Sequence, residues 1–499
     1  MNTPVRFVLD GNPHSVDQVA PTRTVLQYLR EDLGRMGTKE GCAEGDCGAC
    51  TVVVAERLAD PGGERLRWRA LNACILFVPA LDGKALFTID GLDGAGTLHP
   101  AQQAMITCHG SQCGFCTPGI VMSLYALARR RLPEPDRRAV NEALAGNLCR
   151  CTGYRPIVDA AVTMAQTITR DPAWREREDA ADARLLAQLR ELQRPSGVRF
   201  GGPAEAGAFH APRTLAELEA LRRALPHARV VGGATDVGLW VTKKGQALGD
   251  ILYTGQVEEL RQARQDATHL EIGAAVSVAD AAPLLVREYP DFDELFRRFA
   301  SPPIRNAATL GGNIANGSPI GDSMPGLIAL GAEVVLCGGA ERRALPLEDF
   351  YLGYQRTALR PGEIVAAVRV PRSRAGLQFR TSKLSKRFDQ DISAVCAALA
   401  LTLDTGTVGA VRIAFGGMAA TPRRAPRAEA AALGQPWNEA TVRAMMAALD
   451  DDYAPIGDMR ATSAYRRATA ANLLWRFYLE TCAGGIATRL YDFELARGA

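Results

Sequence analysis

The sequence predicts a multidomain protein of the α+β class, and three observations lead to this prediction. The chain has 499 residues, which is more than a single hydrophobic core usually serves. Short β-branched runs mark residues 1–90, and helical spacing of Leu, Ala and Met marks residues 91–168. Beyond residue 198, strand-like and helix-like stretches are mixed. We therefore expect domains of different architecture to follow one another along the chain.

The first domain, residues 1–90, is expected to be a small strand-rich unit. A short helix is predicted at Thr22–Leu29, directly after Pro21, because proline favours the first turn of a helix. Alternating and β-branched runs predict the strands, which are Val5–Leu9, Thr51–Ala55, Arg67–Leu71 and Ala85–Ile89.

Residues 91–168 are expected to form a compact helical unit, and residues 169–197 a linker. The linker is dense in Arg, Glu, Asp and Ala, so we expect a solvated segment that is only partly helical. Apolar residues recur at helical spacing in the unit before it. The predicted helices are His99–Cys108, Pro118–Arg131, Val140–Leu148 and Ile157–Thr169.

Two further α+β domains are expected, at residues 198–374 and 375–499. In the first of them, the predicted helices are Leu215–Leu225 and Asp280–Glu288, and the predicted strands are Ala228–Val231, Leu270–Ala275, Ala332–Cys337 and Ile364–Val370. In the last domain, the predicted strands are Ala394–Leu403 and Val408–Gly416, and the predicted helices are Glu439–Leu449 and Ala464–Cys482.

Composition and charge exclude several classes of protein. The chain is 47% hydrophobic and 23% charged, as in ordinary globular proteins, and its formal net charge is only +3. Nothing in this balance indicates binding to nucleic acid or to an acidic membrane. We find no secretory signal at the start and no apolar run long enough to span a bilayer, so we expect a cytoplasmic protein.

The cysteines are unevenly distributed, and nine of the 12 lie before residue 152. In a reducing compartment, clustered cysteines more often bind metal or carry out redox chemistry than form disulfides. The other three, Cys337, Cys396 and Cys482, are isolated and are expected to be structural; Cys108 is also expected to be structural, because the family resemblance described below gives it no ligand role.

The first cysteine set has the spacing of a plant-type [2Fe–2S] ferredoxin. Cys42, Cys47 and Cys50 form a Cys-x4-Cys-x2-Cys loop, and Cys74 follows in a separate segment. Gly41, Gly45 and Gly48 are expected to allow positive φ and to let backbone N–H groups approach the sulfurs. A structural zinc site is the alternative, but zinc sites favour two short paired hooks.

The second set consists of a Cys-x2-Cys hook, Cys113 and Cys116, and a Cys-x-Cys hook, Cys149 and Cys151. Each hook lies at a helix boundary. Pro118 predicts that Cys116 stands at the positive end of a helix, where the thiolate is favoured over the thiol. Taken alone, this pattern fits either zinc or an iron–sulfur cluster.

Two glycine-rich segments are candidates for binding a phosphate-containing cofactor. Val230–Val237 runs from a predicted strand through Gly232 and Gly233 into a predicted helix, and Thr309–Ile314 is expected to be a second such loop. Backbone N–H groups at these turns can bind a pyrophosphate, and Asp322 can accept hydrogen bonds from sugar-type hydroxyls. Neither segment is the G-x-G-x-x-G fingerprint, so two plain turns and a helix-capping Asp remain the alternative.

Three strings resemble motifs of the molybdenum hydroxylase (xanthine oxidase) family: GCAEGDCGAC at 41–50, QCGFCTPG at 112–119 and LCRCTGYRPI at 148–157. The resemblance implies that residues 1–168 are that family's paired domains, a β-grasp plant-type ferredoxin domain and a four-helix [2Fe–2S] domain. It implies that the second set also holds a [2Fe–2S] cluster, the one nearer the molybdenum cofactor, with Gln112 contacting the pterin. The first cluster would lie nearer a flavin.

Residues 198–499 resemble the FAD-binding subunit of the same family, with a two-subdomain FAD-binding domain followed by an α+β C-terminal domain. The resemblance also places Tyr354 where nicotinamide docks and Asp389–Asp391 beside the flavin ring. Gly232-Gly233-Ala234 departs slightly from the Val-Gly-Asn type of sequence in mammalian members. The implied FAD contacts are Val230, Val231, Gly232, Gly233, Ala234, Thr235, Asp236, Val237, Phe299, Thr309, Leu310, Gly311, Gly312, Asn313, Asp322, Val365 and Lys383.

The order of these parts favours the xanthine dehydrogenase branch of the family. The resemblance implies an electron-transfer subunit that passes electrons from molybdopterin on a partner chain, through two [2Fe–2S] clusters, to FAD and then to NAD+. Because the chain ends at Ala499, we expect the molybdopterin-binding large subunit to be separate, in an (αβ)2 heterotetramer. No residue of this chain is expected to be catalytic in the hydroxylation. The alternatives are reoxidation by O2, another heterocycle or aldehyde as substrate, and a non-redox zinc scaffold.

Overall fold

The structure is a computed structural model that describes residues 3–60, 62–92, 96–131, 135–201, 207–339, 341–482, 484–486 and 488. The chain divides into two compact units. The first unit contains residues up to 261 together with 277–279 and 300–309. The second contains residues 262–276, 280–299 and those from 310 onward. The region expected to bind FAD therefore contributes to both units.

A five-stranded mixed sheet in the order β2-β1-β5-β3-β4 forms the start of the first unit. The predicted short helix begins later than expected, because Thr24 caps it and accepts a hydrogen bond from the backbone N–H of Gln27. The polar strand β2 was not predicted, since its sequence NPHSV reads as a turn. The elements are β1 (Val5–Leu9), β2 (Asn12–Val16), α1 (Val25–Gln27), β3 (Thr51–Asp60), β4 (Gly63–Asn72) and β5 (Ala85–Phe87).

The predicted four-helix unit follows and is confirmed. Its core is made of apolar residues at helical spacing, among them Ile120, Leu124, Ile157 and Met164, all of which are almost completely buried. Met122, on another face of the second helix, packs against strand β3. The helices are α2 (Pro100–Thr107), α3 (Thr117–Ala128), α4 (Arg137–Leu144) and α5 (Arg155–Arg170).

The segment expected to be a solvated linker is instead a long packed helix, α6 (Pro172–Glu191). Leu185 and Leu189 are four residues apart, and both are buried against Val8, Ala55 and Ala85 of the sheet. The prediction of solvation was wrong for this stretch because the high density of charge hides a narrow apolar stripe.

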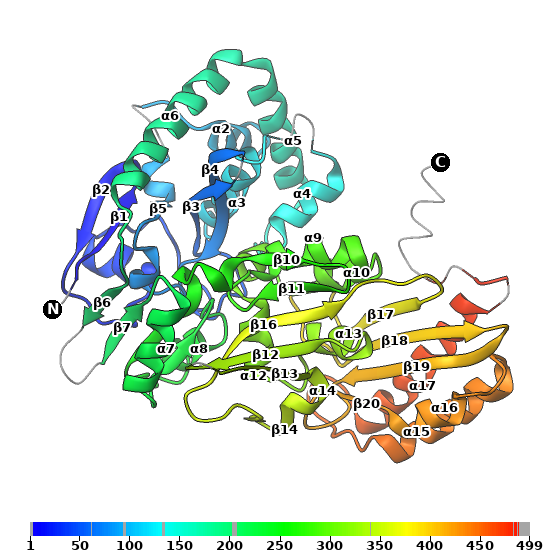
Figure 1. Ribbon diagram of the computed structural model, residues 1–499. Coiled ribbons are helices and arrows are strands. Elements are labelled where there is room, and N and C mark those ends of the chain that lie inside the picture. The colour runs from blue at the N-terminus through cyan, green and yellow to red at the C-terminus, as the bar shows by residue number, and fades with distance from the viewer. Residues whose placement is uncertain are drawn as a thin grey trace. The chain divides into compact units, whose positions relative to one another are not determined.

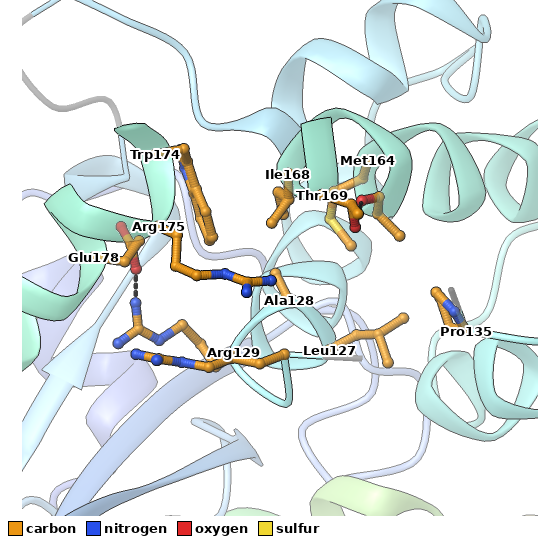
Figure 2. A pocket seen from close by; sticks show the side chains of 12 residues that line it. Leu127, Ala128, Arg129, Pro135, Met164, Ile168, Thr169, Trp174, Arg175 and Glu178 are labelled. Atoms are coloured by element: carbon orange, nitrogen blue, oxygen red, sulfur yellow. Dashed lines mark hydrogen bonds and ion pairs between the residues drawn. The ribbon is translucent and has the colours of Figure 1, made fainter. Parts of the chain in front are cut away.

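The N-terminal half of α6 is fixed to the four-helix unit by an ionic contact. The Arg129 guanidinium stacks on the Trp68 ring at 3.8 Å and pairs with Glu178 and Asp182 of α6. Figure 2 shows the ion pair of Arg129 with Glu178 near Trp174, in a pocket formed by the ends of α3 and α5 and the start of α6. Helix α6 thus contacts both the sheet and the four helices.

The first unit also contains a four-stranded sheet in the order β6-β7-β9-β8. Phe200, Phe209 and Ile251 of this sheet belong to the same hydrophobic core as Phe7 and Phe77 of the N-terminal sheet. The first part of the expected FAD-binding region therefore shares its core with the ferredoxin-like part. The elements are β6 (Val198–Gly201), β7 (Ala208–Ala211), α7 (Leu215–Ala224), β8 (Arg229–Val231), α8 (Val237–Thr242), β9 (Ile251–Tyr253) and α11 (Pro302–Ala307).

The second unit begins with an antiparallel sheet in the order β10-β11-β16-β12-β13. Its central strands each contain an unbroken apolar run, at residues 334–337 and 364–368, as expected for strands that are buried on both faces. The strands are β10 (Ala263–Gln265), β11 (His269–Gly273), β12 (Glu333–Gly338), β13 (Glu341–Pro346), β14 (Tyr351–Gly353), β15 (Arg356–Thr357) and β16 (Ile364–Pro371). The helices are α9 (Val278–Glu288), α10 (Phe292–Arg298), α12 (Leu310–Asn316), α13 (Ser323–Ala329) and α14 (Leu347–Phe350).

An antiparallel sheet with three helices on one face ends the described chain (Figure 1). Its core joins Leu399 and Phe415 of the sheet to Leu474 and Phe477 of the last helix. No helix among the described residues is both long enough and apolar enough to cross a membrane. The elements are β17 (Gln378–Leu384), β18 (Val395–Asp404), β19 (Thr407–Gly416), β20 (Arg423–Arg424), α15 (Pro426–Ala432), α16 (Glu439–Asp452) and α17 (Ser463–Thr481).

Candidate functional site: two thiol sets and a cofactor region

The β3–β4 hairpin brings the first cysteine set together. Cys50 directly precedes β3 and Cys74 follows β4, and the register pairs Thr51 with Asn72 at this end of the hairpin. The Cys74 thiol is hydrogen-bonded to Cys50 and also to Cys42. A fourth thiol, that of Cys47, is hydrogen-bonded to Cys42. Strand pairing therefore closes the set that the spacing predicted.

The sulfur of Cys42 is surrounded by hydrogen-bond donors. The backbone N–H groups of Glu44, Asp46 and Cys47 donate to Cys42 Sγ over 3.3–3.4 Å. The thiols of Cys47 and Cys74, together with these N–H groups, hold the pKa of Cys42 far below its usual range. This environment stabilises anionic sulfur, as a cluster ligand requires.

The glycines of this loop have different roles. Gly45 and Gly48 have φ values of +79° and +70°, as expected. Gly41 is not among the residues with positive φ. A Cβ atom at Gly41 would lie 2.7 Å from Cys47 Sγ, so this glycine is needed for space beside a ligand sulfur.

The second set lies at helix ends, as predicted. Cys113 and Cys116 precede α3, while Cys149 and Cys151 lie between α4 and α5. The thiols are hydrogen-bonded in two pairs, Cys113 with Cys151 and Cys116 with Cys149. Cys113 and Cys151 are exposed, in contrast to the buried Cys50 and Cys74 of the first set.

The helix end at Cys116 does not have the expected effect on the thiol. Cys116 is the N-cap of α3, as Pro118 predicted. Burial, followed by the hydrogen bond to Cys149, nevertheless raises the pKa of Cys116 to about 12. The charge is held instead by Cys149, whose pKa is lowered because the Thr152 hydroxyl and backbone N–H groups outweigh its partial burial. Among the four free thiols the charge is therefore favoured at Cys149 over Cys116, whereas a bound cluster would take all four sulfurs as thiolates.

Both sets fit the [2Fe–2S] group better than a single metal ion. All eight are free thiols, so none is committed to a disulfide. Within the described ranges, no three His, Cys, Asp or Glu side chains form a group that could hold one metal ion. Hydrogen bonds connect all four thiols of the first set and join the second set in two pairs, and a [2Fe–2S] cluster needs four such thiols, two on each iron. Assignment of these cysteines as ligands remains a prediction.

The glycine segment Val230–Val237 has the predicted strand–turn–helix form, between β8 and α8. Its glycines are required by close packing against a neighbouring segment of the same unit. A Cβ atom at Gly233 would lie 1.8 Å from the carbonyl oxygen of Ala307, and one at Gly232 would lie 2.6 Å from Thr309 Oγ1. The first unit thus brings the predicted residues Val230 to Val237 and Thr309 together.

Helix α8 joins this turn to the first cysteine loop, which the sequence did not indicate. Thr242 Oγ1 donates to the carbonyl oxygen of Ala43 at 2.8 Å, and Lys243 Nζ donates to that of Cys42 at 3.0 Å. Thr242 and Lys243 gave no motif signal, because their partners lie about 200 positions away in the sequence.

The second glycine segment is the start of helix α12, not the loop that we predicted. Gly311 and Gly312 lie in the first turn of this helix, and a Cβ atom at Gly311 would lie 2.4 Å from the side chain of Ala274. Close packing therefore explains Gly311, although glycine is otherwise unfavourable within a helix. Asn313, also in α12, accepts a hydrogen bond from Ser323 Oγ at 2.6 Å.

Asp322 and Lys383 form a buried ion pair in the second unit. Lys383 Nζ lies 2.5 Å from Asp322 Oδ2 and donates to the carbonyl oxygen of Asp391 at 2.8 Å. Ser393 Oγ donates to Asp322 Oδ1 at 2.5 Å, an interaction that sequence reasoning missed. Both oxygens of the predicted sugar-binding carboxylate therefore already have donors.

The remaining predicted residues of the second unit occupy varied positions. Phe299 is the buried residue at the end of α10, and Val365 is buried in β16. Tyr354 is largely exposed after β14. Asp391 accepts from the backbone N–H groups of Lys386 and Arg387, which fixes the turn between β17 and β18.

Four protein-family profiles match successive parts of the chain. They are described as a 2Fe-2S iron-sulfur cluster binding domain at residues 7–79, a [2Fe-2S] binding domain at 88–162, an FAD binding domain in molybdopterin dehydrogenase at 203–373, and a CO dehydrogenase flavoprotein C-terminal domain at 380–481. A xanthine dehydrogenase of Emericella nidulans is 35% identical over 95% of this chain. The chain belongs to the molybdenum hydroxylase family.

Other members of the molybdenum hydroxylase family show similar agreement. A xanthine dehydrogenase of Drosophila pseudoobscura is 34% identical over 99% of this chain, and a xanthine dehydrogenase/oxidase of Gallus gallus is 32% identical over 95%. The chain spans only 38–41% of the length of these curated relatives. It corresponds to the iron–sulfur and FAD parts of molybdenum hydroxylases, which serve electron transfer.

Two solved carbon monoxide dehydrogenases of the molybdenum hydroxylase family share part of the fold. One comes from Hydrogenophaga pseudoflava and lacks the Mo-pyranopterin moiety of the molybdenum cofactor; it is 30% identical to this chain, with a TM-score of 0.51. The other is the reconstituted enzyme of Oligotropha carboxidovorans, which is 28% identical with the same TM-score. Each match covers 54% of this chain and 94% of the solved one. The multidomain α+β architecture predicted from the sequence is confirmed.

Proposed function

We propose that this chain is the electron-transfer subunit of a cytoplasmic xanthine dehydrogenase. In this proposal a partner chain carries molybdopterin and oxidises hypoxanthine and xanthine to urate. Electrons then pass through the cluster at Cys113, Cys116, Cys149 and Cys151, through the cluster at Cys42, Cys47, Cys50 and Cys74, and on to FAD and NAD+. The partner is the molybdopterin-binding large subunit, and the assembly is an (αβ)2 heterotetramer.

The observation that carries the proposal is the presence of two complete four-thiol sets in contact within one compact unit. The backbone N–H of Leu148, beside Cys149, donates to the carbonyl oxygen of Cys47 at 3.0 Å. Helix α8 then links the Cys42 loop to the turn at Val230–Val237. Bound clusters would carry single electrons, and a bound flavin would hand a pair to NAD+ as hydride. The work of the chain is therefore to hold and space these groups.

The surroundings of the second set support its place at the partner's side. Two of its thiols are exposed, and so are several apolar side chains close to it in sequence or on the same four helices. Exposed apolar groups around a redox site favour contact with another protein. These side chains are Ile106, Phe115, Leu148 and Tyr154.

The acceptor can be tested by rapid reoxidation of the reduced complex. We expect NAD+ to reoxidise it much faster than O2. A faster reaction with O2 would favour an oxidase instead, a possibility raised by relatives named xanthine dehydrogenase/oxidase. Replacing the exposed Tyr354 with Ala should raise the KM for NAD+ and leave the reaction with O2 unchanged, because the ring is proposed to receive nicotinamide.

The cofactor content can be tested independently of activity. We expect iron and acid-labile sulfide in equal amounts, about four of each per chain, because each cluster contains two of each. Zinc without sulfide would contradict the electron-transfer function and favour a metal-binding scaffold. If the cluster content is normal but the complex prefers an aldehyde to xanthine, the chain would still be an electron-transfer subunit, but of an aldehyde-oxidising complex. One relative, from Cavia porcellus, is named aldehyde oxidase 4.

A further inference from the structure

Two consecutive residues before the second cysteine set bond to two consecutive residues of the first cysteine loop. The Asn147 side chain donates from Nδ2 to the carbonyl oxygen of Gly48 at 3.1 Å. The Leu148 backbone N–H donates to the carbonyl oxygen of Cys47 at 3.0 Å. Cys47 and Cys149 are thus joined by covalent bonds and a single hydrogen bond, through Leu148.

Asn147 is held in one orientation by a buried network. Its side chain is only 4% exposed. Ser123 Oγ, in helix α3, donates to Asn147 Oδ1 at 2.6 Å, which fixes Nδ2 as the end that faces the first loop. Nδ2 also lies 3.2 Å from Thr51 Oγ1, at the start of β3. A buried amide whose oxygen and nitrogen are both satisfied specifies a single arrangement.

Gly48 is tightly enclosed at the same place. Its φ is +70°, and a Cβ atom on it would lie 2.1 Å from the carbonyl oxygen of Gly146. From another side, a Cβ atom on Gly119 would lie 2.1 Å from the carbonyl oxygen of Gly48. The two ligand-bearing loops therefore approach each other more closely than any side chain at these positions would permit.

We propose that Asn147 is a positioning residue that sets the distance and the electronic contact between the two clusters. This inference rests on the proposed function, because it needs both thiol sets to hold clusters. Asn147 is not expected to be needed for holding either cluster. Gly48 O also accepts from the Thr51 backbone N–H at 3.1 Å and from Thr51 Oγ1 at 2.7 Å. Removing the amide therefore leaves this carbonyl satisfied and removes one of the two hydrogen bonds between the loops, while the bond from the Leu148 N–H to the Cys47 carbonyl oxygen remains.

The test is electron paramagnetic resonance of the fully reduced complex, in which each cluster splits the signal of the other. We expect clear mutual splitting in the wild type. In Asn147→Ala we expect both cluster signals at full intensity, a smaller splitting, and slower electron transfer between the clusters, because only the Leu148–Cys47 hydrogen bond then joins the two loops. Asn147→Asp has nearly the same shape and still accepts from Ser123, but it cannot donate to Gly48 O, so it should behave like the Ala variant.

The matched control is Asp136→Ala. Asp136 caps helix α4, the helix just before Asn147, and accepts from the Ala139 N–H at 2.7 Å. Its loss weakens the same helical unit without touching the first loop, so the splitting should remain. Should Asn147→Ala fail to fold, Ser123→Ala decides the question, because it removes only the hydroxyl that orients the amide. Reduced splitting in that variant supports the proposal.

Three results would overturn the inference: no mutual splitting in the wild type, unchanged splitting in the Asn147 variants, or unchanged splitting in Ser123→Ala where the Asn147 variants do not fold. Loss of a whole cluster signal in a folded Asn147→Ala protein would also overturn it, because the residue would then be needed for assembly and not for spacing. The absence of both cluster signals from wild-type protein would instead refute the proposed function itself. Failure of the inference and failure of the function can thus be distinguished.

Discussion

The two cysteine sets differ in what surrounds them, although each has four thiols. The first set has Cys50 and Cys74 buried at the end of a β-hairpin. Its loop is braced from outside by Thr242 and Lys243. The second set has two exposed thiols and depends on the ends of helices that other elements hold in place. The first site is therefore built into a core, whereas the second lies at a surface.

This difference predicts that the first set contributes more to the stability of its domain, whereas the second set is more accessible to a partner. A buried ligand is part of the packing of its domain, so its loss affects folding as well as metal binding. An exposed ligand can be changed with less effect on folding, and its cluster can be approached by a partner. Variants at the two sites test whether the buried set contributes more to stability than the exposed set does.

The largest expected effect is that of Cys74→Ser compared with Cys151→Ser. Each variant should lose one cluster, and with it about half of the iron, because a [2Fe–2S] cluster needs four ligands. Cys74→Ser should also lower the unfolding temperature clearly, since it places a hydroxyl in the buried space between Cys42 and Cys50. Cys151→Ser should unfold close to the wild-type temperature. Iron analysis and calorimetry measure both effects.

Equal unfolding temperatures in these two variants would contradict the division between a core site and a surface site. Retention of all iron in Cys74→Ser would contradict its assignment as a ligand.

The next effect concerns the support of the second site by helix α6. Arg129→Leu removes the buried partner of Glu178 and Asp182, whose side chain is only 4% exposed, while Asp182 keeps its ion pair with Arg131. We expect the free energy of unfolding to fall by about 2–3 kcal/mol, below the value for fully buried pairs because both acids are partly exposed. Denaturant unfolding monitored by circular dichroism checks this value.

Arg177→Leu on the same helix is the matched control. The ion pair of Arg177 with Asp171 is exposed, so the free energy of unfolding should fall by no more than about 1 kcal/mol. If the Arg177 variant lost as much unfolding free energy as the Arg129 variant, interactions within α6 would matter as much for stability as the contact between α6 and α3.

The smallest effect is a pH dependence of the helical unit. His99 caps α2 with Nδ1 accepting from the Ala101 N–H at 3.1 Å, and burial lowers its pKa from 6.5 to about 4. Between these two values the unfolded chain binds more protons, so stability is complete above pH 6.5 and falls as the pH is lowered. At pH 5 the loss should be about 2 kcal/mol.

His99→Asn keeps a capping side chain without the titration. The difference in unfolding free energy between pH 7 and pH 5 should therefore shrink in this variant by about the same 2 kcal/mol. An unchanged difference would show that other groups govern the acid sensitivity.

Local pattern sufficed for many elements. The apolar spacing of α3 and α5 and the β-branched run of β3 predicted these elements to within a few residues, apart from the far end of β3. Pattern failed where packing decided the outcome. Gly311 lies in a helix, where Ala274 leaves no room for a side chain, and α6 is packed because two leucines contact the sheet. Neither neighbour is close in sequence, so no local signal could reveal it.

The ligand chemistry proposed for this protein could be predicted from the sequence alone. The spacing of Cys42, Cys47 and Cys50 in a glycine-rich loop indicated an iron–sulfur ligand set before any fold was known. The contact between the two cysteine-bearing loops is visible only in the tertiary structure, because the Asn147–Gly48 and Leu148–Cys47 hydrogen bonds join residues about a hundred positions apart. The ligands of a cluster can be recognised within one loop of the sequence. The distance between two sites depends instead on how closely two backbone segments approach each other, which is a result of folding.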